Sequence, residues 1–183
     1  MSVLKATIMD EGTLLRTVRR MSYEIVEKNK GTENICLVGI KRRGEVLAQM
    51  IAQNINQTDG ASVPCGSLDI SLYRDDLSSN LGEDLETPII RKSYLPFDIV
   101  NKNVIIVDDV LYTGRTVRSA IDAVFTIGRP KAIRLAILID RGHRELPIRA
   151  DYIGKSIPTS ASEQVSVMLP PYDTSTGVIL YGK

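Results

Sequence analysis

The chain has 183 residues, of which 43% are hydrophobic and 25% charged, and this is typical of one soluble globular domain with a core of its own. The formal net charge is +1, so nucleic-acid binding would have to come from a local basic face and not from the field of the whole molecule. A single histidine and two cysteines, neither in a metal-binding spacing, exclude a histidine-rich or cysteine-rich metal site.

The first part of the chain is expected to alternate helices with buried strands. Apolar residues at helical spacing predict a helix over residues 10–29, and the apolar run Ile35–Ile40 predicts a buried strand. The polar loop Lys41–Gly44 follows, and apolar residues between positions 46 and 55 predict a second helix. Apolar and polar residues alternate over 68–73, which predicts a strand with one wetter face.

The second part continues this alternation after a long charged segment. The segment 74–93 carries no clear period, and a loop of this length is usually functional or disordered. Val104–Val107 is expected to be a third buried strand, 116–127 a helix capped by Gly128, and Ala132–Ile139 a fourth strand. Strands that alternate with helices imply an α/β fold built on a parallel sheet.

Glycines and prolines punctuate the chain after Asp140, which indicates a smaller, irregular subdomain continuous with the core. No internal repeat or low-complexity tract argues for a second domain. We therefore expect one domain over residues 1–183, with a core of about 1–140 and the subdomain largely within 141–183.

Two adjacent carboxylates, Asp108 and Asp109, end an apolar run, and Thr113–Thr116 precede a helix. Ligands of open α/β sheets bind at the carboxyl ends of strands, and a helix N-terminus favours an anion. The acids would repel phosphate, but they suit ribose hydroxyls or a Mg²⁺ that bridges hydroxyls and pyrophosphate. The pattern therefore predicts a phosphorylated ribose as ligand. The alternatives are a Mg²⁺-binding phosphotransfer domain and a plain turn. The Walker pattern is absent, which disfavours a P-loop nucleotidase.

The segment VIIVDDVLYTGRT resembles the phosphoribosylpyrophosphate (PRPP) motif of type I phosphoribosyltransferases. Further segments resemble the bifunctional pyrimidine operon attenuator and uracil phosphoribosyltransferase; they are GIKRRG, ASVPCGSLDISLYRDDL, DRGHRELPIRADYIGK and IPTSASE. The resemblance implies the type I fold, with a central, mostly parallel sheet flanked by helices and a small hood subdomain. It also implies transfer of phosphoribosyl from PRPP to uracil, which gives UMP and diphosphate.

The resemblance assigns roles to individual residues. Asp108 and Asp109 would hold the ribose hydroxyls and the Mg²⁺ that accompanies PRPP, and Arg74 would act from a loop that closes over the site. The 5′-phosphate would be bound by Val110, Leu111, Tyr112, Thr113, Gly114, Arg115 and Thr116. Pyrophosphate would be bound by Lys41, Arg42, Arg43 and Gly44, with Arg91 and Lys92 reaching it from the loop. Uracil would lie against Asp140, Arg141, Tyr152 and Ile153.

Tyr112 stands where the related hypoxanthine phosphoribosyltransferases carry an Asp that deals with a purine ring proton. Uracil loses its N1 proton more readily than a purine does, so a dedicated carboxylate base is less needed. We hypothesise that Tyr112 favours uracil over purines.

Basic residues gather in two places, on the polar side of the first helix and after the fourth strand. They are Arg16, Arg19, Arg20, Arg141, Arg144, Arg149 and Lys155. If both sets lie on one face, they form a patch that tracks the phosphates of a folded RNA, whereas charge alone favours an ordinary solvated face. The resemblance implies binding to the leader transcript of the pyrimidine operon, with UMP promoting attenuation.

The chain departs from the expected pattern at four positions. Arg19 and Tyr23 stand near an expected Thr and His on the RNA-facing side, Ala161 replaces an Arg, and Arg42 replaces the Thr of KTRG. A salvage enzyme without RNA regulation is therefore an alternative, as is a regulator that binds PRPP and UMP but turns over poorly. An orotate-specific enzyme is a weaker fourth interpretation.

The remaining expectations concern location and assembly. Charged residues interrupt any hydrophobic start, and no apolar run approaches the roughly 20 residues that span a bilayer. We therefore expect a cytoplasmic protein with no membrane partner. The resemblance implies that the chain forms a dimer or a larger homo-oligomer.

Overall fold

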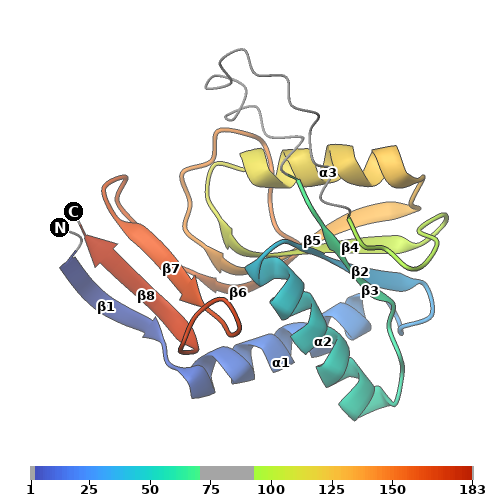
Figure 1. Cartoon of the computed structure of the whole chain (residues 1–183), viewed down its shortest axis with the longest axis horizontal. Coiled ribbons are helices and arrows are strands. Elements are labelled where there is room, and N and C mark those ends of the chain that lie inside the picture. Colours follow the sequence, from blue (N-terminus) through green and yellow to red (C-terminus); the bar gives the residue numbers. More distant parts are fainter. Residues whose placement is uncertain (1–2, 71–92, 183) are drawn as a thin grey trace.

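The computed structural model describes residues 3–70 and 93–182, which form two sheets and three helices (Figure 1). The large sheet has the order β3-β2-β4-β5-β6, and all its neighbouring strands are parallel. Its strands are β2 (Ile35–Ile40), β3 (Cys65–Leu68), β4 (Asn103–Leu111), β5 (Ala132–Asp140) and β6 (Tyr152–Ser156). The α/β fold with a parallel sheet that the sequence predicts is therefore confirmed.

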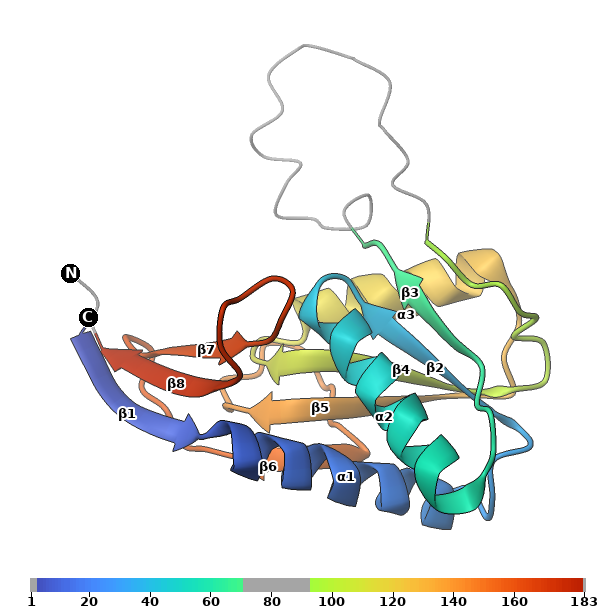
Figure 2. The same ribbon diagram turned by 60° about the horizontal axis from the view of Figure 1, so that its bottom comes forward.

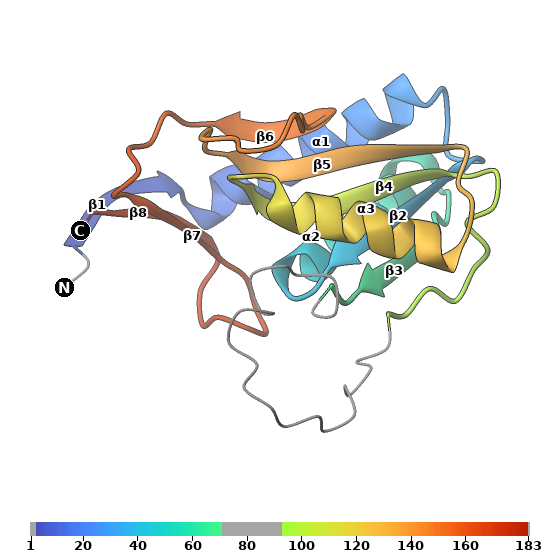
Figure 3. The ribbon, with the colours of Figure 1, turned by 90° about the horizontal axis from the view of Figure 1, so that it is seen from above.

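Helices cover both faces of this sheet. Figure 3 shows α3 (Arg115–Ile127) on one face and both α1 (Glu11–Lys28) and α2 (Arg43–Asp59) on the other. Helix α1 begins where the sequence predicts, because the Asp10 side chain accepts a hydrogen bond of 2.7 Å from the Thr13 amide and caps the helix. In the described part of the chain, no helix combines the length and apolar character needed to cross a membrane.

Two predicted strand boundaries are wrong. Strand β4 continues to Leu111, because Val110 and Leu111 still pair with Ile139 and Asp140 of β5. The acidic pair therefore lies inside β4 and not after it. Strand β3 covers Cys65–Leu68 and pairs in parallel with β2, so it begins before the predicted range 68–73, of which residues 71–73 lie outside the described part of the chain.

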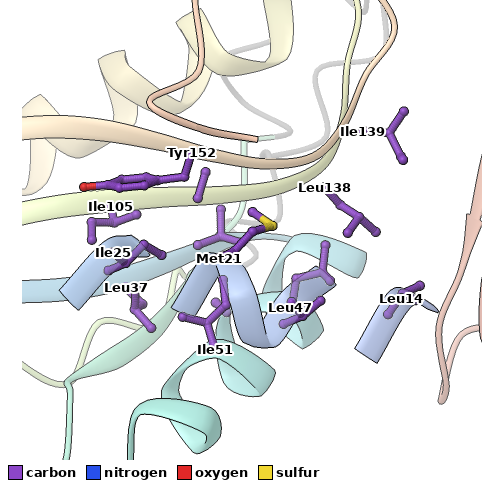
Figure 4. Packing of buried hydrophobic residues seen from close by; sticks show 14 of the residues in the cluster. Leu14, Met21, Ile25, Leu37, Leu47, Ile51, Ile105, Leu138, Ile139 and Tyr152 are labelled. Carbon is purple, nitrogen blue, oxygen red and sulfur yellow. The ribbon is translucent and has the colours of Figure 1, made fainter. Parts of the chain in front are cut away.

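The core consists of two apolar clusters, one on each face of the large sheet. The cluster under α1 and α2 includes Leu14, Ile25, Leu37 and Tyr152, which Figure 4 shows among the packed side chains. The cluster under α3 includes Val124 and residues from the other face of the same strands. A sheet that is buried on both faces explains why its strands read as continuous apolar runs.

A second, antiparallel sheet forms the hood and has the order β1-β8-β7 (Figure 2). Its strands are β1 (Val3–Met9), β7 (Gln164–Met168) and β8 (Gly177–Gly182). The predicted division near residue 140 does not follow this pairing. Strand β1 joins the hood although it begins the chain, and β6 extends the large sheet although it follows residue 140.

Candidate functional site

Asp108 and Asp109 lie near the carboxyl end of β4, the central strand of the large sheet. The Asp109 amide donates to Asp108 Oδ1 over 2.9 Å, and the Val110 amide donates to Asp109 Oδ1 over 2.8 Å. Burial, then the neighbouring Asp109 charge, raises the pKa of Asp108 well above its usual value. Burial also raises the pKa of Asp109. Burying two adjacent carboxyls is unfavourable, which is typical of a functional site.

The start of α2 lies directly against this pair. A Cβ at Gly44 would lie 2.4 Å from the Val107 carbonyl oxygen and 3.2 Å from Asp108 Oδ1. Only glycine therefore lets the first turn of α2 approach β4 this closely. The predicted pyrophosphate loop Lys41–Gly44 and the acidic pair are thus brought together, with Arg43 and Gly44 in the helix rather than in a loop.

Arg43 connects the start of α2 to the hood. Its Nε and Nη2 donate to Asp173 Oδ2 and Oδ1 over 3.0 and 2.9 Å. Asp173 lies between β7 and β8, and sequence reasoning missed it because nothing local marks it as a partner of Arg43. Lys41 and Arg42 are exposed beside this contact, and the peptide bond between them is cis.

The turn before α3 has the geometry expected of an anion-binding loop. Gly114 has φ +95°, a left-handed value that favours glycine, and it is the N-cap of α3. The Thr113 carbonyl oxygen accepts hydrogen bonds of 3.0 and 3.2 Å from the Glu145 and Leu146 amides, which fix the turn. The first amides of a helix lack partners within the helix and can bind an anion.

Not every residue predicted for the 5′-phosphate belongs to this turn. Val110 and Leu111 are the last residues of β4, and the Val110 amide is already donated to Asp109. Both residues therefore lie before the turn, and their role toward the 5′-phosphate stays a prediction. Arg115 begins α3 and pairs with Glu145, with 2.7 Å between Nη2 and Oε2. Thr113 and Thr116 are partly exposed at the turn.

Two arginines after β5 are engaged inside the protein. Arg144 Nη2 donates to Asp140 Oδ2 over 2.5 Å, and Nη1 donates to the Tyr112 carbonyl oxygen over 2.8 Å. Arg141 is buried, and its Nη2 donates to the carbonyl oxygens of Ser160 and Glu163. Arg144 thus holds the turn, and Arg141 connects the end of β5 to the segment before β7, while their role as RNA ligands stays a prediction.

A cavity of about 220 Å³ opens between the turn and the hood. Its lining residues are Tyr112, Arg141, Ala161, Ser162, Glu163, Gln164, Tyr181 and Gly182. The Arg141 guanidinium lies 4.1 Å from the centre of the Tyr112 ring, so the aromatic wall has a fixed orientation. The IPTSASE motif marks this hood segment in the sequence, but the motif alone predicts no base-binding role for residues 161–164.

The predicted uracil ligands Tyr152 and Ile153 lie elsewhere. Tyr152 is 1% exposed within the core cluster (Figure 4), and its hydroxyl accepts a 2.8 Å hydrogen bond from Asn29 Nδ2. The Ile153 carbonyl oxygen accepts from Arg20 Nη2 over 3.0 Å. Tyr152 pairs with Ala136, in the middle of β5, which keeps it away from the carboxyl end of the sheet. The Tyr152 ring is therefore enclosed in the core, whereas the role of the Ile153 backbone stays a prediction.

Asp140 and Arg141 do lie at the carboxyl end of β5. The Asp140 carboxylate is shared between Arg144 and the Gly142 amide, which donates to Oδ1 over 3.0 Å. Arg141 lines the cavity with its guanidinium held by the hood. Of the predicted uracil ligands, Arg141 alone lines this cavity.

The exposed basic residues come from different elements of the fold. Arg16 and Arg19 are exposed on α1, whereas Arg149 follows Ile148, which packs in the cluster under α3 on the other face of the sheet. Lys155 is exposed on the edge strand β6, between the two faces. Arg20 Nη2 donates to the Ile153 and Gly154 carbonyl oxygens, so this guanidinium covers the edge of β6.

Several predicted residues lie outside the described part of the chain. They are Arg74, with its predicted catalytic role, and Arg91 and Lys92, which are predicted to reach the pyrophosphate. All three fall between residues 71 and 92, which separate the described segments 3–70 and 93–182.

Comparisons with known proteins agree on a family. The model of the phosphoribosyl transferase domain matches residues 6–173. The Bifunctional protein PyrR of Thermoanaerobacter sp. (strain X514) is 54% identical over 180 residues, 98% of this chain and 99% of that protein. The Bifunctional protein PyrR of Acetivibrio thermocellus is 57% identical over 169 residues, 92% of this chain and 90% of that protein.

Solved structures show the same fold. A hypoxanthine-guanine phosphoribosyltransferase from Bacillus anthracis superposes with a TM-score of 0.68 and 23% sequence identity, and the match covers 99% of each chain. At this identity the likeness shows the type I phosphoribosyltransferase fold alone.

Proposed function

The chain belongs to the phosphoribosyl transferase family and, within it, to the Bifunctional PyrR proteins, and from this membership we propose both of its activities. It transfers phosphoribosyl from PRPP to uracil, and it attenuates transcription of pyrimidine biosynthesis genes by binding leader RNA in response to UMP. The observation that carries the enzymatic proposal is the convergence of the acidic pair, the start of α2 and the turn before α3 at one edge of the sheet.

PRPP would occupy this edge with its 5′-phosphate, ribose and pyrophosphate in different places. The 5′-phosphate binds at the turn and the first amides of α3, where Gly114 permits close approach. The ribose hydroxyls donate to the carboxylates of Asp108 and Asp109, which would repel a phosphate. The pyrophosphate lies toward the start of α2, where Arg43 supplies a cation.

The acidic pair fits a Mg²⁺ that arrives with the substrate. The described residues contain no group of three or more His, Cys, Asp or Glu side chains that could hold a metal ion, so the protein alone offers few ligands. Mg²⁺ is commonly held by one or two carboxylates and completed by substrate oxygens. When bound, it would neutralise charge on the departing diphosphate. Asp108 and Asp109 would hold it together with PRPP.

The transfer breaks the bond between C1 of the ribose and the diphosphate oxygen and forms a bond from C1 to N1 of uracil. The bonding pair leaves with the diphosphate, and the N1 proton is lost to solvent. Fixed cations at the start of α2 stabilise the departing charge without reorganisation. Holding the base and sugar in one geometry supplies much of the remaining acceleration.

Uracil would lie in the cavity between Tyr112 and the hood segment 161–164. The packing of Arg141 against Tyr112 supports this location, because it fixes a flat wall next to the ribose site. Tyr112 would then favour uracil, as its position in the motif suggests. Hypoxanthine turnover comparable to uracil turnover would refute that role.

RNA would bind along α1 and around the edge of β6. Arg16, Arg19 and Lys155 are exposed there, whereas Arg141 and Arg144 are engaged within the protein. The Arg19 side chain adds positive charge where an uncharged Thr was expected. A homo-oligomer would bring two such surfaces together; this assembly and the cytoplasmic location remain predictions.

Two assays test the two activities. Purified protein with uracil, PRPP and Mg²⁺ is expected to form UMP and diphosphate in equal amounts, and no UMP would contradict the enzymatic proposal. Filter binding with a pyrimidine leader hairpin is expected to tighten when UMP is added. Binding that UMP does not enhance would favour the salvage enzyme without RNA regulation.

A further inference from the structure

The turn between β7 and β8 lies next to the start of α2 (Figure 2), and an ion pair between Arg43 and Asp173 joins them. Both oxygens of Asp173 accept from Arg43, over 3.0 and 2.9 Å. The two side chains are 33% and 20% exposed, so the contact is partly shielded from water. A bidentate, partly buried pair fixes geometry far better than an exposed single contact.

Asp173 is itself held in place by the hood. The Leu169 amide donates to Asp173 Oδ2 over 2.9 Å, and the Asp173 amide donates to the Leu169 carbonyl oxygen over 3.1 Å. The hydrogen bond from Arg43 lowers the pKa of Asp173, so the carboxylate stays ionised at neutral pH. The hood turn therefore presents a fixed negative charge to the start of α2.

Only one edge of the Arg43 guanidinium is used by this contact. Nε and Nη2 form the edge that faces Asp173, and a planar guanidinium has further donors on Nη1. The charge of Arg43 also acts on Asp109, where it opposes the rise in pKa caused by burial. The same side chain thus lies between the hood and the acidic pair.

We propose that Asp173 is a positioning residue for phosphoribosyl transfer, which fixes the plane of Arg43 so that its Nη1 edge meets the diphosphate group of PRPP. This inference rests on the proposed function, because it takes the start of α2 as the diphosphate site. Asp173 does not touch the reacting atoms. It acts through Arg43, and it makes the hood part of the diphosphate site.

The variant Asp173→Asn tests this role. Asparagine keeps an acceptor for the Leu169 amide but removes the charge and the two-oxygen contact with Arg43. We expect the KM for PRPP to rise about tenfold, with kcat and the KM for uracil nearly unchanged, because ground-state orientation of one substrate is lost. Asp173→Glu keeps the charge and should bring the KM for PRPP part of the way back to the value of the unaltered protein. Asp122→Asn removes an exposed carboxylate on α3 and should leave all constants unchanged.

An unchanged KM for PRPP in Asp173→Asn would overturn the proposal. A lower KM would also overturn it, because Asp173 would then compete with PRPP for Arg43. Parallel losses in every constant together with a lower melting temperature would show a merely structural role. Calorimetric titration of PRPP with Mg²⁺ repeats the comparison without turnover. Absence of UMP formation by the unaltered protein would contradict the proposed function instead.

Discussion

At the scale of single residues, the acidic pair serves the function of the protein but lowers its stability. Asp108 is 7% exposed, and its carboxylate lies beside that of Asp109. Such an arrangement persists only where its chemistry is needed, because burying an uncompensated charge is unfavourable. The pair therefore distinguishes this strand from an ordinary core strand more sharply than its apolar residues do.

Replacing Asp108 by Asn should stabilise the protein and abolish UMP formation. Asparagine keeps the oxygen that accepts from the Asp109 amide, but it removes the buried charge. We expect the free energy of unfolding at neutral pH to rise by about 1–2 kcal/mol, as is common when a functional strain is relieved. Thermal denaturation in the absence of PRPP and Mg²⁺ measures the change, and a lower melting temperature would contradict it.

The difference in stability between Asp108→Asn and the unaltered protein should depend on pH. The folded-state pKa of Asp108 is raised above the usual value of 3.8, so the folded protein holds its proton where the unfolded chain has released it. The free energy of unfolding of the unaltered protein therefore falls as the pH rises from about 3.8 through the raised pKa of Asp108. Above that pKa the loss of stability is complete. The advantage of Asp108→Asn should be small at acidic pH and grow toward neutrality.

At the scale of elements, the direction in which β6 points the Tyr152 ring distinguishes between two roles for this residue. The sequence motif suggests a base-stacking aromatic, but the strand points this ring into the core beneath α1. Tyr152→Phe should lower the free energy of unfolding by about 1 kcal/mol, because one partly buried hydrogen bond from Asn29 is removed.

Steady-state kinetics of Tyr152→Leu, which removes the aromatic ring, should show an unchanged KM for uracil. The exposed Tyr172 provides a matched control, and Tyr172→Phe should change neither stability nor kinetics. A rise in the KM for uracil in Tyr152→Leu, with the KM of Tyr152→Phe unchanged, would restore the stacking role that the sequence motif suggests.

Helix α1 should carry the main RNA contacts. Replacing Arg16 and Arg19 together by Ala should weaken hairpin binding and reduce the salt slope of log K by about 0.7 for each phosphate that the protein no longer neutralises. UMP formation should be unchanged. Arg129→Ala, beyond the end of α3, is the matched control. Equal salt slopes for the double variant and the control would exclude α1 from the interface.

The sequence predicts best those elements that depend on local pattern. Helix α1 lies within the predicted range 10–29, and β2 covers Ile35–Ile40 as expected. Strand β1 was not predicted, because its residues 3–9 gain strand structure only by pairing with β8 at the other end of the chain. Asp173 was missed for the same reason, since its contact with Arg43 spans the fold.

At the scale of the whole molecule, the site lies where three segments that are distant in the sequence meet. They are the start of α2, the end of β4 with the turn before α3, and the hood. The large sheet supplies the acidic pair, α2 and α3 supply their N-termini, and the hood supplies Asp173 and one wall of the cavity. The pairing of β1 with β8 brings the first and last described strands side by side in the hood (Figure 2). The hood is thereby anchored next to the carboxyl end of the large sheet.

A crystal structure with UMP bound tests this arrangement most directly. We predict the 5′-phosphate at the turn of Gly114, the ribose hydroxyls against Asp108 and Asp109, and the uracil ring in the cavity beside Tyr112. UMP bound at any other place, with the edge of β4 left without a ligand, would contradict the account.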